Sequence, residues 1–233
     1  MKTWTEEQVA TFLASVRGHR LHALWRTAAT TGMRRGEVLA LTWPGFDPIT
    51  RRLHVTQALV TGPRGGPPRF GPPKTDRGRR AVPLDPETVR VLQEHHRRQL
   101  EERKAAGETY QDQGLIFCRP DGRPLDPDVV THTFGRLAVR ARLPLIRLHD
   151  LRHTFATLSL KAGIPTEVVS RIPFPDRATP EPGEVHQVDV VGRGTSTEGS
   201  RLLVERDAKP AWMPDVPKWL RNANNEWTKQ DGT

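Results

Sequence analysis

The spacing of apolar and polar positions over the first 172 residues predicts a mostly helical domain. In several stretches apolar residues recur every three or four positions, which places them on one face of a helix. The helix that begins at Thr5 is expected to bury Val9, Phe12, Leu13 and Val16. The predicted helices cover residues 5–16, 21–31, 35–41, 86–106, 127–142, 149–161 and 165–172.

Capping residues and helix breakers set the ends of several of these helices. Thr5 followed by two glutamates is typical of a helix start, and Pro86 suits the first position of the longest helix. Gly32 ends or bends the second helix, and Gly163 ends the helix that contains residues 149–161.

Three shorter stretches predict β-strands. Arg52–Val60 alternates, with Leu53, Val55, Gln57 and Leu59 on one face. A loop rich in glycine and proline, residues 61–75, leads to a second strand at Arg80–Leu84, so these two strands predict an antiparallel hairpin. A third strand is expected at Leu115–Cys118, before a turn. The predicted fold class is therefore α+β, mostly α-helical, with a small antiparallel β-sheet.

The chain changes character near residue 172. Prolines follow at 173, 175, 180 and 182. Of the 36 lysines and arginines, 8 lie in residues 173–233, together with 10 of the 27 acidic residues, so residues 1–172 carry a net charge of +11 and residues 173–233 a net charge of −2. We expect a domain at 1–172 and a divergent C-terminal segment at 173–233, partly without fixed structure. Trp212, Trp219 and Trp227 predict a short amphipathic docking piece in that segment.

The positive charge of residues 1–172 favours a polyanionic partner, of which nucleic acid is the commonest. The alternative is a basic surface without a particular partner. Cys118 is the only cysteine and lies in an apolar run, so neither a disulfide nor a cysteine-based zinc site is predicted. The chain shows no signal peptide and no apolar run long enough for a membrane span. These features predict a cytoplasmic protein without a membrane partner.

The stretch Leu148–Thr157, LHDLRHTFAT, carries the first candidate chemistry. His149 and His153 have the spacing of a zinc-binding pair on a helix, but the cation of Arg152 beside them opposes a divalent metal. A guanidinium fork beside an imidazole suits a phosphate instead, because it bonds two phosphate oxygens at once. We therefore predict an anion site here and no metal. The apolar residues Leu148, Leu151, Phe155 and Leu158 define the buried face of the helix.

Two further stretches contain candidate phosphate ligands. In Thr31–Glu37, TGMRRGE, Gly32 breaks a helix and Arg34 follows where the next helix begins, a location whose free amides and dipole favour an anion. Arg35 is expected on a solvated helix face. Lys74, in the proline-rich loop of the hairpin, can reach into a groove, although a lysine on a loop is more often only solvated.

Together, TGMRRGEVLALTW, the lysine in PPKT and HDLRHTFAT resemble the catalytic domain of the phage integrase, or tyrosine recombinase, family, over residues 4–172. The resemblance implies double-stranded DNA as partner, no cofactor, and attack of a tyrosine on a DNA phosphate. Arg34 and Arg152 would then clamp the phosphoryl oxygens, Lys74 would protonate the leaving oxygen, and His149 would bond the phosphate or move a proton. Glu37 would brace Arg34, and His153 would contribute packing or a supporting hydrogen bond.

The resemblance fails after residue 172. The family continues with a Leu-Gly-His segment and the nucleophilic tyrosine, and neither follows Arg152 in this sequence. The only tyrosine, Tyr110, lies far upstream and is expected to anchor a loop. His186, Ser196 and Thr197 lack a setting that would make them replacements. We therefore expect a recombinase whose C-terminal part has been replaced, and which lacks the family's usual N-terminal DNA clamp.

Two functional hypotheses follow from these residues. The first is a site-specific recombinase or integrase that serves DNA integration and recombination, impaired because the nucleophile is missing. The second is a DNA-binding remnant or regulator that holds phosphate without cutting. Both predict DNA binding, with a possible homo-oligomer on DNA. A third alternative, a basic helical domain that binds no DNA, has the least support.

Overall fold

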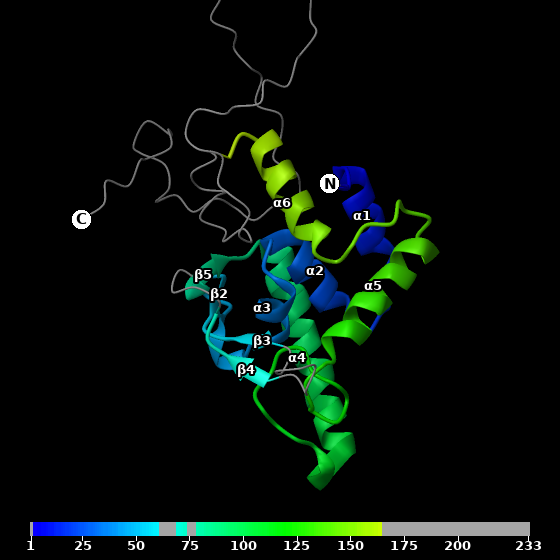
Figure 1. Ribbon diagram of the computed structural model, residues 1–233. Helices are drawn as coiled ribbons and strands as arrows, with labels where there is room; N and C mark the ends of the chain where they lie inside the picture. The colour runs from blue at the N-terminus through cyan, green and yellow to red at the C-terminus, as the bar shows by residue number, and fades with distance from the viewer. Residues whose placement is uncertain (1, 61–68, 74–77, 165–233) are drawn as a thin grey trace, which may run out of the picture.

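The computed structural model describes residues 2–60, 69–73 and 78–164. These residues form helices with a small β region at one side of them, so the predicted α+β, mostly helical class is confirmed (Figure 1). The helices are α1 (Glu6–Ser15), α2 (His22–Thr31), α3 (Arg35–Leu39), α4 (Pro86–Ala106), α5 (Pro127–Arg140) and α6 (Asp150–Lys161), with short 3-10 helices at Trp43–Gly45 and Gly107–Thr109. The strands are β1 (Phe46–Asp47), β2 (Arg52–Val55), β3 (Ala58–Val60), β4 (Arg69–Gly71) and β5 (Arg80–Pro83).

An aromatic cluster joins the helices at the centre of the core. Phe12 of α1 packs against Trp4, Trp25 and Phe134, with ring centroids 5.2, 6.5 and 5.3 Å away. All four rings are buried. The N-terminal segment is also fixed to α6, because the backbone N–H of Trp4 donates to the Thr154 hydroxyl at 3.1 Å. Burial of such large rings supplies much of the free energy that holds a domain of this size together.

The local signals at the helix ends are confirmed. The Thr5 hydroxyl accepts from the Gln8 N–H, and the Gln8 side chain accepts from the Thr5 N–H, which completes a capping box at α1. Gly32 follows α2 in the left-handed conformation, at φ 60°. α4 begins at Pro86, where the Asp85 carboxylate caps the helix by accepting from the Thr88 N–H.

The predicted hairpin is present, but its first strand is divided. β2 pairs antiparallel with β5, with Leu53 opposite Val82, and β1 completes a three-stranded sheet. β3 instead pairs with β4 in a separate two-stranded sheet. The prediction of one strand over residues 52–60 was wrong because the chain leaves the first sheet at Gln57, whose side-chain amide donates to the Ala40 carbonyl at 3.1 Å. β4 lies in a stretch predicted as loop.

Two helix ends and one strand were also predicted wrongly. α3 ends at Leu39 rather than 41, and α5 ends at Arg140 rather than 142. Residues 115–118 are buried, as expected, but they form only isolated bridges, at Leu115 with Thr42 and at Cys118 with Pro124. A stretch this short is held by its side chains in the core rather than by a continuous ladder.

The expectations for 165–172 and 173–233 lie outside the described residues, so the boundary near 172 stays a prediction. No helix among the described residues is both long and apolar enough to cross a bilayer.

Candidate functional site

The break between α2 and α3 meets the start of α6. Gly32 is at the centre of this contact, since a Cβ added to it would lie 2.6 Å from the Cδ1 atom of Phe155 in α6. Arg152, one helical turn earlier, donates from Nη1 to the Gly32 carbonyl oxygen at 2.6 Å. The two arginine motifs, about 120 residues apart in sequence, are therefore joined directly. Figure 1 shows α6 beside α2 at this junction.

A cluster of charged side chains surrounds this junction, and we call Arg34, Glu37, Arg80 and Arg152 the arginine cluster. Glu37 is only 2% exposed. Its Oε1 accepts from Arg34 Nη1 at 3.2 Å, and its Oε2 accepts from the Arg34 N–H and from Arg80 Nη2, both at 2.9 Å. Glu37 thus braces Arg34, as the resemblance implied. α3 has only five residues and the Arg34 N–H is already bonded to Glu37, so an anion here would be bound by guanidinium groups and not by the helix end.

The cluster carries an excess of positive charge at neutral pH. Burial, together with the nearby charges of Arg34 and Arg80, lowers the pKa of Arg152 to about 10, while the charge of Glu37 acts in the opposite direction. Burial raises the pKa of Glu37, but the bonds from Arg80 and Arg34 more than offset it, so this pKa lies below its usual value. Three positive charges and one negative charge leave a net of +2 among the described members of the cluster.

His149 lies beside Arg152, at the N-terminal end of α6. Burial lowers its pKa, and the neighbouring His153 and Arg152 act in the same direction. The imidazole is therefore neutral at pH 7 and offers one N–H donor and one acceptor nitrogen. The rings of His149 and His153 meet edge to face, 5.1 Å apart, which agrees with the packing role expected for His153.

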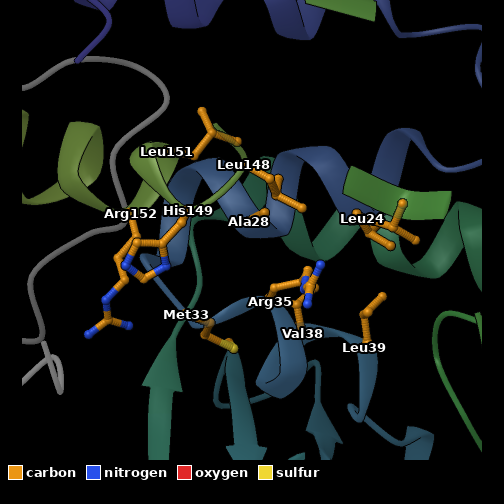
Figure 2. A pocket seen from close by; sticks show the side chains of 11 residues that line it. Leu24, Ala28, Met33, Arg35, Val38, Leu39, Leu148, His149, Leu151 and Arg152 are labelled. Atoms are coloured by element: carbon orange, nitrogen blue, oxygen red, sulfur yellow. The ribbon is translucent and has the colours of Figure 1, made fainter. Parts of the chain in front are cut away.

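A small cavity adjoins this end of α6. Its volume is about 20 Å³, enough for about one water molecule. Figure 2 shows His149 and Arg152 together at one end of it, with Leu24 and Leu39 towards the other. The cavity is too small and too apolar for a nucleotide. A substrate would have to approach the arginine cluster from the surface instead.

Lys74, the fourth predicted site residue, lies outside the described residues. Arg34, His149 and Arg152 do lie close together. Two arginines differ from what the sequence predicted: Arg35 has protein contacts that were not expected, and Arg80 was not singled out at all.

The side chain of Arg35 is 35% exposed, but it also has partners on α5. Its Nη1 donates to the Thr131 hydroxyl at 2.7 Å and to the Pro127 carbonyl at 3.1 Å, and it pairs with Asp128 at 3.3 Å. Arg35 therefore fastens α3 to the first turn of α5. This contact depends on tertiary packing, which gave no signal in the sequence around Arg35.

Arg80 is the site residue that the sequence analysis missed. It begins β5, opposite Val55 of β2, and its side chain is 15% exposed. The hairpin prediction placed it at the start of a strand, but its partner Glu37 lies 43 residues upstream. One signal was available in the sequence. A buried Glu37 has two carboxylate oxygens that need hydrogen-bond donors, and Arg34 alone does not supply all of them.

Tyr110 belongs to a different part of the molecule. Its hydroxyl lies 3.6 Å from the Cys118 sulfur, and the Arg103 guanidinium lies over its ring, 5.9 Å from the centroid. Burial and the Cys118 contact raise the pKa of its hydroxyl. Tyr110 follows α4, whose C-terminal end lies far from α6 (Figure 1). It anchors a loop, as predicted, and has no contact with the arginine cluster.

No three histidine, cysteine, aspartate or glutamate side chains within 2–60, 69–73 and 78–164 are grouped as a metal site.

The fold and the two joined arginine motifs are those of a tyrosine-type recombinase catalytic domain. The chain belongs to the phage integrase family, whose model matches residues 2–172. This confirms the resemblance drawn from the sequence.

Two relatives share 32% identity with the chain over 182 residues. One is a "Tyrosine recombinase XerC-like" from Caldanaerobacter subterraneus subsp. tengcongensis, for which the match covers 74% of this chain and 46% of the relative. The other is an integrase from Streptomyces ambofaciens, with 73% and 45% covered. The chain therefore spans less than half of the length of these relatives.

Solved structures show the same fold. The Tn1549 transposon integrase in complex with a circular intermediate DNA superposes with a TM-score of 0.62 at 24% identity, covering 73% of this chain and 57% of the integrase. The XerA recombinase superposes with a TM-score of 0.57 at 21% identity, covering 74% of this chain and 55% of XerA.

Proposed function

We propose that this chain binds a phosphodiester of double-stranded DNA at the arginine cluster, as part of a protein of DNA integration and recombination. The observation that carries the proposal is that the fold brings the guanidinium groups of Arg34 and Arg152 into one largely buried cluster, where Glu37 orients the first and the Gly32 carbonyl the second. Guanidinium groups in such an arrangement match the oxygens of a phosphate.

Each residue has a proposed role. Arg34 and Arg152 bond the non-bridging oxygens of the phosphate, and the neutral His149 donates a further hydrogen bond. Arg152 is 2% exposed, so DNA binding has to uncover it by a small rearrangement. Lys74 stays the predicted general acid for the leaving 5′-oxygen.

Several observations support DNA as the ligand. The family is one of integrases, and the Tn1549 relative is bound to DNA. Residues 1–172 carry a net charge of +11, which suits the phosphate backbone. A cytoplasmic location and a homo-oligomer on DNA stay predictions that accompany this proposal.

Two forms of this function differ in strand cleavage. A covalent mechanism needs a nucleophilic hydroxyl in the same pocket as the arginines. Tyr110, the single tyrosine of this sequence, bonds Cys118 instead. We propose binding without cleavage by this chain, with an impaired recombinase as the alternative.

The test measures the binding of a fluorescein-labelled DNA duplex by anisotropy, at several salt concentrations. Arg34→Ala is expected to weaken binding about tenfold or more, the usual loss for a charge-assisted hydrogen bond. Arg34→Ala should also reduce, by about one, the steepness with which the logarithm of the affinity falls with the logarithm of the salt concentration. Arg152→Lys keeps the charge of this buried residue but loses the fork, and should weaken binding as well. Arg90→Gln is the matched control, because Arg90 is exposed and pairs with Glu87 of its own helix.

Unchanged affinity in both site variants would refute the phosphate site. Cleavage is tested separately with a nicked suicide substrate. A covalent protein–DNA adduct that disappears in Tyr110→Phe would favour the recombinase, and binding without an adduct would favour the non-cutting protein.

A further inference from the structure

Arg80 is the member of the arginine cluster that lies on a strand, at the start of β5. Its two terminal nitrogens have separate partners: Nη2 donates to Glu37 Oε2 at 2.9 Å, and Nη1 donates to the Gly78 carbonyl at 3.1 Å. Its charge also acts on Arg152. Arg80 therefore connects the start of β5 to the carboxylate that braces Arg34.

The two carboxylate oxygens of Glu37 accept hydrogen bonds from different donors. Oε2 accepts from both Arg80 and the Arg34 N–H, whereas Oε1 accepts from the Arg34 guanidinium. The last torsion of a glutamate side chain has a broad, weakly restrained profile. Bonds to Oε2 therefore fix the plane of the carboxylate, and that plane decides where Oε1 directs Arg34. A planar guanidinium held at two points gives this orientation better than a single point charge would.

We infer that Arg80 is a positioning residue: it acts through Glu37 to hold the Arg34 guanidinium in the orientation that bonds phosphate. This inference rests on the proposed function of the arginine cluster. It predicts a particular form of non-additivity. If Arg80 acts only through Arg34, its removal has no further effect once Arg34 is gone, because residues in one network do not contribute independently.

The experiment is a double-mutant cycle on DNA affinity, with the full chain, a labelled duplex and anisotropy at fixed salt. The variants are Arg34→Ala, Arg80→Gln and the combination, with Arg90→Gln as the control for loss of one positive charge. Arg80→Gln alone should weaken binding about tenfold. In the Arg34→Ala background the same change should weaken binding by less than about twofold. Arg90→Gln should leave the affinity of each background unchanged.

Arg80→Lys provides a second variant in case Arg80→Gln does not fold, as judged by circular dichroism and thermal unfolding. The lysine keeps the charge but cannot hold Glu37 and the Gly78 carbonyl with one rigid fork. It should give a smaller loss, about threefold, that again disappears in the Arg34→Ala background.

Two results would overturn the inference while leaving the proposed function intact: a loss that is equal in both backgrounds, which would mean that Arg80 contacts phosphate directly, or no loss at all in folded Arg80 variants. If Arg34→Ala itself leaves the affinity unchanged, the inference fails, and if Arg152→Lys does so too, the phosphate site is refuted.

Discussion

Gly32→Ala tests whether the junction between the two arginine motifs has the geometry described. Gly32 lies at φ 60° with ψ 20°, and an added Cβ would meet Phe155 Cδ1 at 2.6 Å. The left-handed conformation costs a residue with a Cβ about 1 kcal/mol or somewhat more. Displacing a packed aromatic ring adds about 1–3 kcal/mol. The expected loss in the free energy of unfolding is therefore about 2–5 kcal/mol.

The assay is urea unfolding of the full chain, followed by fluorescence and circular dichroism. Gly114→Ala is the matched control, because Gly114 also has a positive φ, 65°, but a Cβ there would meet nothing within 4 Å. The control isolates the conformational cost, so the difference between the two variants measures the clash. Phe155→Leu should recover part of the difference in the Gly32→Ala background.

DNA affinity provides an independent reading of the same change. A shift of Gly32 moves the carbonyl that accepts from Arg152, so Gly32→Ala should weaken DNA binding even where the protein is fully folded. Gly114→Ala should not. Equal losses of stability in the two glycine variants would refute the described packing of α6 on α2.

Two further predictions concern stability away from the arginine cluster. Burial lowers the pKa of His95 from 6.5 to about 4. The unfolded chain therefore binds a proton that the folded chain does not, and stability should be complete above pH 6.5 and fall by about 3 kcal/mol between pH 6.5 and 4. His95→Gln should flatten this dependence in urea titrations, and an unchanged slope would contradict it. Asp85→Ala leaves the buried Arg26 without its carboxylate, which should cost about 3–5 kcal/mol. Glu87→Ala, at an exposed ion pair, is the control and should change the unfolding midpoint little; similar shifts in both variants would contradict the buried pair.

Local signals were enough to predict most of the helices. Thr5, Gly32 and Pro86 act on the backbone within a few residues, so their effects can be inferred from the sequence around them. The 52–60 stretch shows the limit of such inference. The alternation of apolar and polar residues is present in β2. The division of the stretch into two strands, however, depends on pairing with β5 and β4, which lie further along the chain.

The candidate site has the same limit: the residues that lie in local motifs could be predicted, and those that depend on distant partners could not. Arg34, His149 and Arg152 lie in motifs whose residue types indicate phosphate chemistry, and the fold joins them. Arg35 and Arg80 gave no such signal, because their roles depend on partners 43 or more residues away. A charged side chain on a short helix or at the start of a strand looks solvated until the packing of the domain is known.

If the arginine cluster binds phosphate as proposed, its arrangement separates that binding from strand cleavage. Arg152 is held by the Gly32 carbonyl, Arg34 by Glu37, and Glu37 in turn by Arg80. All of these bonds lie within the described part of the chain, and none uses a tyrosine hydroxyl. The orientation of the arginines is thus set by folding of the domain itself, which is the form of preorganisation that electrostatic stabilisation of a phosphate requires. Loss or replacement of a nucleophile would remove the covalent step while leaving this binding geometry in place.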